Sequence, residues 1–165
     1  MKKDRFLNGI LAGIGLLILI ALVLFFTRQN QAKYLSEDTP KGVVNNYILA
    51  VIQHDYDKAY SYLINSKDKP DMVNFQQELA RTSNEISQLN VTIGDVYIDH
   101  ESATVQLNIR QYYEGAFNNL SRYSDVAQLT LENGQWKISS MPYPLWSWNW
   151  YVPNAYPTPE PGANQ

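Results

Sequence analysis

The spacing of apolar residues changes once along this chain, and the change limits the class of fold. Between Pro40 and Gln88 apolar residues recur every three or four positions, which is typical of helices with one buried face. After Gln88 they alternate with polar residues, as in strands with one buried face. Helices followed by antiparallel strands predict an α+β domain with its helices on one face of a sheet.

Three helices are predicted before the change. The first has Thr39 as its N-cap and Pro40 at the first helical position, and extends to about residue 53. Asp55 suits the N-cap of a short second helix, and Asp71 that of a third. The apolar residues expected to face inward are Val44, Tyr47, Ile48 and Val51, then Tyr56, Ala59, Tyr60 and Leu63, then Met72, Phe75, Leu79 and, in a continuation, Ile86.

Four strands are predicted after the change. The alternation of residues 89–93 continues one position out of phase at residues 96–98, which predicts a β-bulge at Gly94-Asp95. Residues 103–109 form the most regular alternating strand, and residues 114–122 are expected to be a longer connection.

The last two strands are predicted to form a hairpin. Asn133-Gly134 suits a two-residue type I′ turn, which pairs Leu131 with Trp136 and Leu129 with Ile138. The strand positions expected inside the domain are Val96, Ile98, Val105, Leu107, Ile109, Leu129, Leu131, Trp136 and Ile138. All of them are apolar.

A run without charged residues, Phe6–Thr27, precedes the domain. As a helix, its 22 residues would extend roughly 33 Å, and a bilayer's hydrocarbon core is about 30 Å thick. The run is long for a secretory signal and has no small residues at its end for cleavage. It therefore predicts an uncleaved, single-pass transmembrane anchor at residues 6–27.

The flanks of the run predict its orientation. Lys2, Lys3 and Arg5 precede it, so we expect residues 1–5 in the cytoplasm and the rest of the chain outside the cell membrane. Gly9 and Gly13 form a GxxxG pair, through which two anchors could pack closely.

Charge and composition exclude several kinds of partner and chemistry. Residues 1–35 carry a net charge of +4, and residues 36–165 carry −7. An acidic outer domain without a basic run argues against nucleic acid as the partner. The chain has no cysteine, which excludes disulfides, thiol catalysis and thiolate metal sites.

The order of these elements is similar to a known superfamily. "PKGVVNNYILAVIQHDYDKAYSYL", then bent strands, then "NGQWKI", resembles the NTF2-like superfamily, the cone-shaped fold shared with ketosteroid isomerase. The resemblance covers residues 39–142 and is closest to anchored, exported members, many of which have no known activity. It implies three helices packed on a curved four-stranded sheet, a cone cavity, and dimerisation through the open sheet face. Residues 28–38 would then be a linker, and residues 143–165 an aromatic segment with a proline-rich tail.

The interior offers little for catalysis. Enzymes of the resembled superfamily place an Asp, Glu, His or Tyr inside the cone, where burial shifts its pKa. Here the inward strand positions are apolar, His54 lies in a break between helices, and His100 lies in a turn between Asp99 and Glu101. The sequence therefore predicts no catalytic residue, no metal site and no cofactor.

Three tryptophans alternate near the C-terminus, at Trp146, Trp148 and Trp150. An extended segment would place all three indoles on one side. They could then form a lid over the core, dock a protein partner or a second copy, lie at the membrane interface, or stack on a sugar. The sugar interpretation is weakened because the segment lacks clustered Asp, Asn and Arg residues.

Together these patterns predict a non-catalytic binding or docking module, an accessory subunit of a membrane or envelope complex. The alternatives are a small-molecule carrier, or an isomerase- or dehydratase-type enzyme that uses the cone cavity. The candidate ligand- or partner-binding residues are Trp146, Trp148, Trp150, Tyr151, Tyr143, Tyr47, Tyr60 and Trp136.

Overall fold

The computed structural model describes residues 5–28, 33–113 and 119–151, except for the side chains of residues 5–9, 12, 23–28, 113 and 119. The chain divides into two units, Met1–Lys33 and Tyr34–Gln165. The proline-rich tail and residues 1–4 lie outside the described residues.

The first unit contains α1 (Arg5–Arg28). Within the described part of the chain, no helix is long and apolar enough to cross a membrane. The predicted span, residues 6–27, lies only partly within the described side chains, and Gly9 of the GxxxG pair lies outside them. At Gly13 an added Cβ would have no atom within 4 Å.

The second unit begins with a layer of helices. They are α2 (Pro40–Ile52), α3 (Tyr56–Ser61), α4 (Met72–Arg81) and α5 (Ser83–Ser87). The three predicted N-caps are confirmed, because the side chains of Thr39, Asp55 and Asp71 each accept a hydrogen bond from a backbone N–H in the first turn. Sequence periodicity and capping together thus located these helix starts.

The predicted helix number was wrong, because α5 is separate from α4. Thr82 breaks the helix between them, and its hydroxyl lies within hydrogen-bonding distance of the Glu78, Leu79 and Pro144 carbonyl oxygens, at 3.2, 3.4 and 3.3 Å. Such side-chain to backbone bonds compete with a regular helix. Ile86, expected on a continuation of the third helix, is buried on α5 instead.

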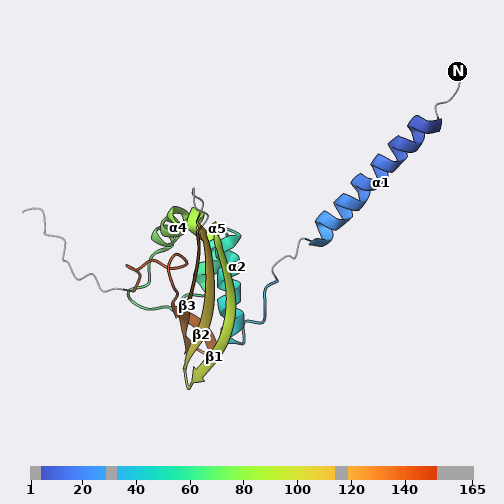
Figure 1. Cartoon of the computed structure of the whole chain (residues 1–165). Helices are drawn as coiled ribbons and strands as arrows, with labels where there is room; N and C mark the ends of the chain where they lie inside the picture. The colour runs from blue at the N-terminus through green and yellow to red at the C-terminus, as the bar shows by residue number, and fades with distance from the viewer. Residues whose placement is uncertain (1–4, 29–32, 114–118, 152–165) are drawn as a thin grey trace, which may run out of the picture. The chain divides into compact units, whose positions relative to one another are not determined.

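The strands form one antiparallel sheet in the order β1-β2-β3-β4, and its long strands are curved (Figure 1). Their bounds are β1 (Leu89–Asp99), β2 (Ser102–Tyr113), β3 (Asn119–Glu132) and β4 (Gln135–Ser140). The bulge is confirmed, because the β1–β2 register shifts between Ile93 and Val96. The connection predicted at residues 114–122 was partly wrong: β3 pairs with β2 from Asn119 onward.

The hairpin register is as predicted. Leu131 pairs with Trp136, and Leu129 with Ile138. Asn133 and Gly134 have φ angles of 51° and 78°, which a type I′ turn requires at both central positions.

Most of the predicted interior positions form the core. Val105, Leu107, Ile109, Leu129 and Ile138 are fully buried. Val96, Leu131 and Trp136 are only partly buried. The prediction for Ile98 was wrong, because its side chain is 59% exposed at the turn end of β1, which has a strand neighbour on one side only.

The second unit includes residues 34–38, which were expected to be part of a linker. Asn46 is fully buried, and its side chain bonds both the N–H and the carbonyl of Leu35, at 2.7 and 2.9 Å. A Cβ at Gly42 would lie 1.8 Å from the Ser36 carbonyl oxygen, so only glycine allows this close approach. Leu35 and Ser36 of the expected linker therefore contact α2.

Candidate functional site

The aromatic segment, Met141–Tyr151, consists of turns and is not extended. The Leu145 N–H donates to the Pro142 carbonyl at 3.0 Å, and the Trp150 N–H to the Ser147 carbonyl at 3.1 Å. The expectation that all three indoles share one side was therefore wrong. Trp146 and Trp150 are 8% and 6% exposed, whereas Trp148 is 81% exposed, because the turn directs its side chain away from its neighbours.

The two buried tryptophans belong to one aromatic cluster. Trp150 packs against Phe75 of α4 and against Trp146, with ring centres 5.0 Å apart in both pairs. Tyr151 stacks on Trp146 at 5.5 Å, and Tyr60 meets Phe75 edge-on at 5.3 Å. Trp150 thus packs on α4 through Phe75, and Trp146 is buried beside it.

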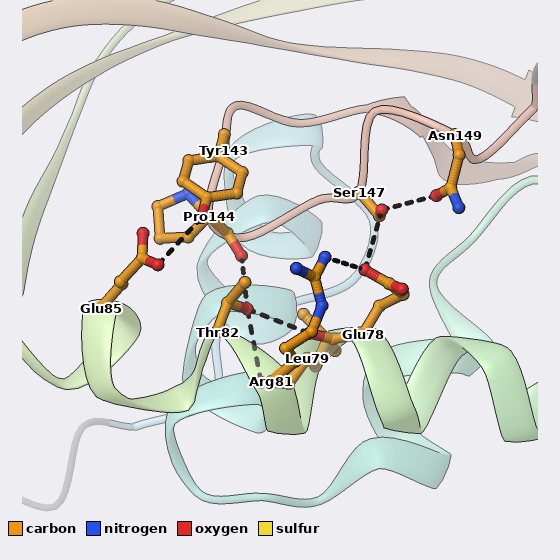
Figure 2. A network of polar contacts seen from close by, with 9 residues as sticks. All are labelled: Glu78, Leu79, Arg81, Thr82, Glu85, Tyr143, Pro144, Ser147 and Asn149. Atoms are coloured by element: carbon orange, nitrogen blue, oxygen red, sulfur yellow. Dashed lines mark hydrogen bonds and ion pairs between the residues drawn. The ribbon is translucent and has the colours of Figure 1, made fainter.

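Polar contacts fix the aromatic segment to α4 and to the α4–α5 junction (Figure 2). The Ser147 hydroxyl lies 3.2 Å from a Glu78 carboxylate oxygen and also bonds the Asn149 side chain. The Thr82 hydroxyl lies 3.3 Å from the Pro144 carbonyl oxygen. These bonds hold the backbone on both sides of Trp146.

A third contact involves Tyr143. Its hydroxyl donates to Glu85 at 2.9 Å, and this hydrogen bond raises the pKa of the Tyr143 phenol. Glu78, Thr82 and Glu85 were not singled out from the sequence. Their spacing of four and then three residues is that of one helical stripe, a signal that could have identified them.

The hydroxyls of two tyrosines join the aromatic segment to the rest of the domain by hydrogen bonds to backbone carbonyls. The Tyr47 hydroxyl donates to Leu145 at 2.6 Å, and the Tyr151 hydroxyl to Ile64 at 2.6 Å. Burial raises the pKa of both phenols, so both remain protonated at neutral pH. Since these protons are donated to the backbone, the two tyrosines act as structural donors here.

A polar cleft of about 350 Å³ lies beside the segment. Its lining residues are Lys67, Asp68, Lys69, Pro70, Asp71, Asn74, Glu78, Asn149 and Trp150. The ammonium of Lys69 lies 4.2 Å from the centre of the Tyr60 ring, and burial lowers its pKa. Most of these polar residues come from residues 67–78, so the sequence around the tryptophans could not indicate them.

The eight candidate residues do not form a single site. Trp146, Trp150, Tyr151 and Tyr60 belong to the aromatic cluster, and Tyr47 packs beneath Leu145. Trp148 and Tyr143 are exposed. Trp136 lines a separate hollow of about 170 Å³ together with Tyr62 and Glu37.

Neither histidine lies in the core. His100 is exposed and bonds Asp99 at 2.6 Å, and His54 lies 3.0 Å from the Tyr56 hydroxyl. In the described part of the chain, no group of three or more His, Asp and Glu side chains could hold a metal ion.

No family model matches the chain, and no curated protein matches it. Several solved structures are similar to it. A SEC-C motif-containing protein from Rhodopseudomonas palustris is 14% identical over 64% of this chain and 79% of its own, with a TM-score of 0.48. A candidate ketosteroid isomerase from Shewanella frigidimarina is 15% identical over 65% and 96%, with a TM-score of 0.47.

A candidate NTF2-like transpeptidase from Campylobacter jejuni is 18% identical over 61% of this chain and 96% of its own, with a TM-score of 0.46.

Proposed function

We propose that this protein is a non-catalytic docking module with an NTF2-like domain, in which Trp148 contacts a protein partner. The observation that carries the proposal is the position of Trp148. Its side chain is 81% exposed, between two tryptophans that are almost fully buried. Exposed tryptophans are favoured anchors at protein interfaces.

The surroundings of Trp148 support this role because they fix its backbone before any partner binds. Ser147 bonds Glu78 of α4, and the Trp150 N–H closes the turn on the Ser147 carbonyl. A contact residue on a fixed backbone loses less conformational entropy on binding, so more of its contact energy contributes to affinity.

The filled interior favours docking over the carrier and the enzyme. Tyr47, Leu107 and Ile109 are at most 1% exposed inside the domain, where a cone cavity was expected. The buried side chains of the described strands are apolar except for the amide of Gln111, and the Tyr47 proton is donated to a backbone carbonyl. An isomerase or dehydratase would need a proton-transferring group facing a substrate.

We further propose that α1 attaches the module to the cell membrane, with residues 1–5 inside and the domain outside. What supports this is the exposure of apolar side chains around α1. Residues 16–20 are five consecutive leucines and isoleucines, and each is at least 46% exposed. Consecutive residues point to all sides of a helix, and such a surface favours lipid over water. Tethering would raise the local concentration of even a weak partner, as in an accessory subunit.

The first experiment is native mass spectrometry of the full chain, extracted gently from its own membrane. We expect a companion protein in fixed ratio, and we expect Trp148→Ala to lose it. Tyr97→Ala is the matched control, because Tyr97 is an exposed aromatic, 68%, on β1 rather than on the aromatic segment.

The outcomes separate the parts of the proposal. A bare monomer in the wild type would contradict docking, and a dimer that Trp148→Ala dissociates would make the partner a second copy. Loss of the companion only in Tyr97→Ala would place the contact on the sheet. Release of the chain from membranes by alkaline carbonate would contradict integral attachment through α1.

A further inference from the structure

A cavity of about 340 Å³ lies at the C-terminal end of α2, and the functions considered so far do not use it. Its lining residues are Val51, Ile52, His54, Tyr56, Leu79, Ser83, Asn84, Ile86 and Ser87. All of them come from the helical half of the domain and none from the sheet. It is therefore separate from the expected cone interior and from the aromatic segment.

His54 lies in the left-handed conformation at the end of α2. The His54 N–H bonds the Val51 carbonyl at 3.1 Å, and the Asp55 N–H bonds the Ala50 carbonyl at 2.9 Å. These two bonds form a Schellman motif at the end of α2, with His54 in the left-handed position at φ 59°. Glycine usually occupies that position because it adopts positive φ without the steric cost of a Cβ.

The side chain of His54 lies at the cavity and is oriented by Tyr56. Its Nδ1 is 3.0 Å from the Tyr56 hydroxyl, and the two rings meet edge-on with centres 5.8 Å apart. His54 is an exposed residue, and its ring contacts Tyr56 through Nδ1. The imidazole is therefore oriented through one nitrogen and has the other available to a ligand.

We propose that this cavity binds an uncharged small molecule with an apolar body and one hydrogen-bonding oxygen, which His54 contacts. The volume lies at the lower end of the range for small-molecule sites, about 300–1,000 Å³. Val51, Ile52, Leu79 and Ile86 supply apolar walls. The lining contains no Lys, Arg, Asp or Glu, so it offers no permanently charged group to pair with a charged ligand.

The test uses the two histidines of the chain, His54 and His100, as reporters. The full chain in mild detergent is labelled only at histidine, so that its NMR spectrum has two ring signals. We expect 2-naphthol to shift the His54 signal saturably and to leave the His100 signal unchanged. We expect 2-naphthoate, of similar shape but charged, to shift neither.

A blocking variant and a backbone variant complete the test. Ser87 is an exposed lining residue, so Ser87→Trp should abolish the His54 shift without lowering the melting temperature. His54→Gly should weaken naphthol binding, followed by naphthol fluorescence, about tenfold, the effect of one lost hydrogen bond. The same change should keep or raise the melting temperature, because glycine adopts the left-handed conformation without the steric cost of a Cβ.

His100→Gly is the matched control, since His100 also has a positive φ, 51°, but does not line the cavity. It should leave naphthol binding at the wild-type value. A His54 signal that does not move with 2-naphthol, or that moves together with His100, would overturn the proposal. Equal binding of 2-naphthoate would overturn the assignment of an uncharged ligand.

Discussion

Trp150 is the residue at which the packing of the aromatic segment can be tested most directly. Its indole is 6% exposed and packs on Phe75 and Trp146. Within the described residues, its Nε1 is buried without a hydrogen-bond partner. Burial of the ring therefore stabilises the domain, whereas burial of the unpaired N–H destabilises it. Substitutions can separate these two effects.

The expected magnitudes follow from burial. Truncating a buried aromatic residue to alanine costs about 3–5 kcal/mol of unfolding free energy. Removing a buried unsatisfied N–H returns about 1–3 kcal/mol. Trp150→Ala should therefore cost about 2 kcal/mol, the difference between the midpoints of the two ranges, and Trp150→Phe, which keeps a ring but loses the N–H, should cost less than about 1 kcal/mol. Trp148→Ala should stay within about 0.5 kcal/mol, because that indole is exposed.

The assay is thermal unfolding of the full chain in mild detergent, followed by near-ultraviolet circular dichroism. In a domain of this size each kcal/mol corresponds to about 4 °C, so Trp150→Ala should lower the melting temperature by about 8 °C. Equal melting temperatures for Trp150→Ala and Trp148→Ala would refute the packing described. A Trp150→Phe variant as unstable as Trp150→Ala would show that the indole N–H makes a bond that the domain needs.

Three further perturbations test other parts of the domain. The unfolding free energy should fall above about pH 10, by up to about 1.4 kcal/mol per pH unit for the fully buried Tyr47 phenol and by less for the partly buried Tyr151 phenol, because both keep in the folded state a proton that the unfolded chain loses; urea titrations above pH 10 measure the slope, and a flat profile would contradict it. Gly42→Ala should destabilise the domain by about 1–3 kcal/mol or more, since its Cβ would collide with the Ser36 carbonyl; limited proteolysis should then cleave within residues 34–38, and an intact segment would count against the contact. Gly134→Ala should cost about 1–2 kcal/mol, because its φ is 78° while the space around it is open; an unchanged melting temperature would show that the turn is not type I′.

Local chemistry explains what could be read directly from the sequence. Helix starts depend on residues next to one another, so Thr39, Asp55 and Asp71 were recognisable as caps. The hairpin register depends on a turn that the dipeptide Asn133-Gly134 specifies by itself.

The errors came from contacts between distant residues. The break between α4 and α5 depends on Thr82, whose hydroxyl bonds Pro144 from a distant part of the chain. The contact of the expected linker with α2 depends on Asn46, which binds the backbone of Leu35.

The aromatic segment shows most clearly what the sequence determined and what only the tertiary structure decided. The sequence by itself determined that Trp146, Trp148 and Trp150 lie close together and that a large apolar surface needs cover. Only the tertiary structure decided that Trp146 and Trp150 are buried while Trp148 is exposed. The physical reason is that turns, unlike strands, have no fixed period: their direction is set by whichever partners the folded chain supplies. Here those partners are Glu78, the junction at Thr82 and the Tyr47 hydroxyl.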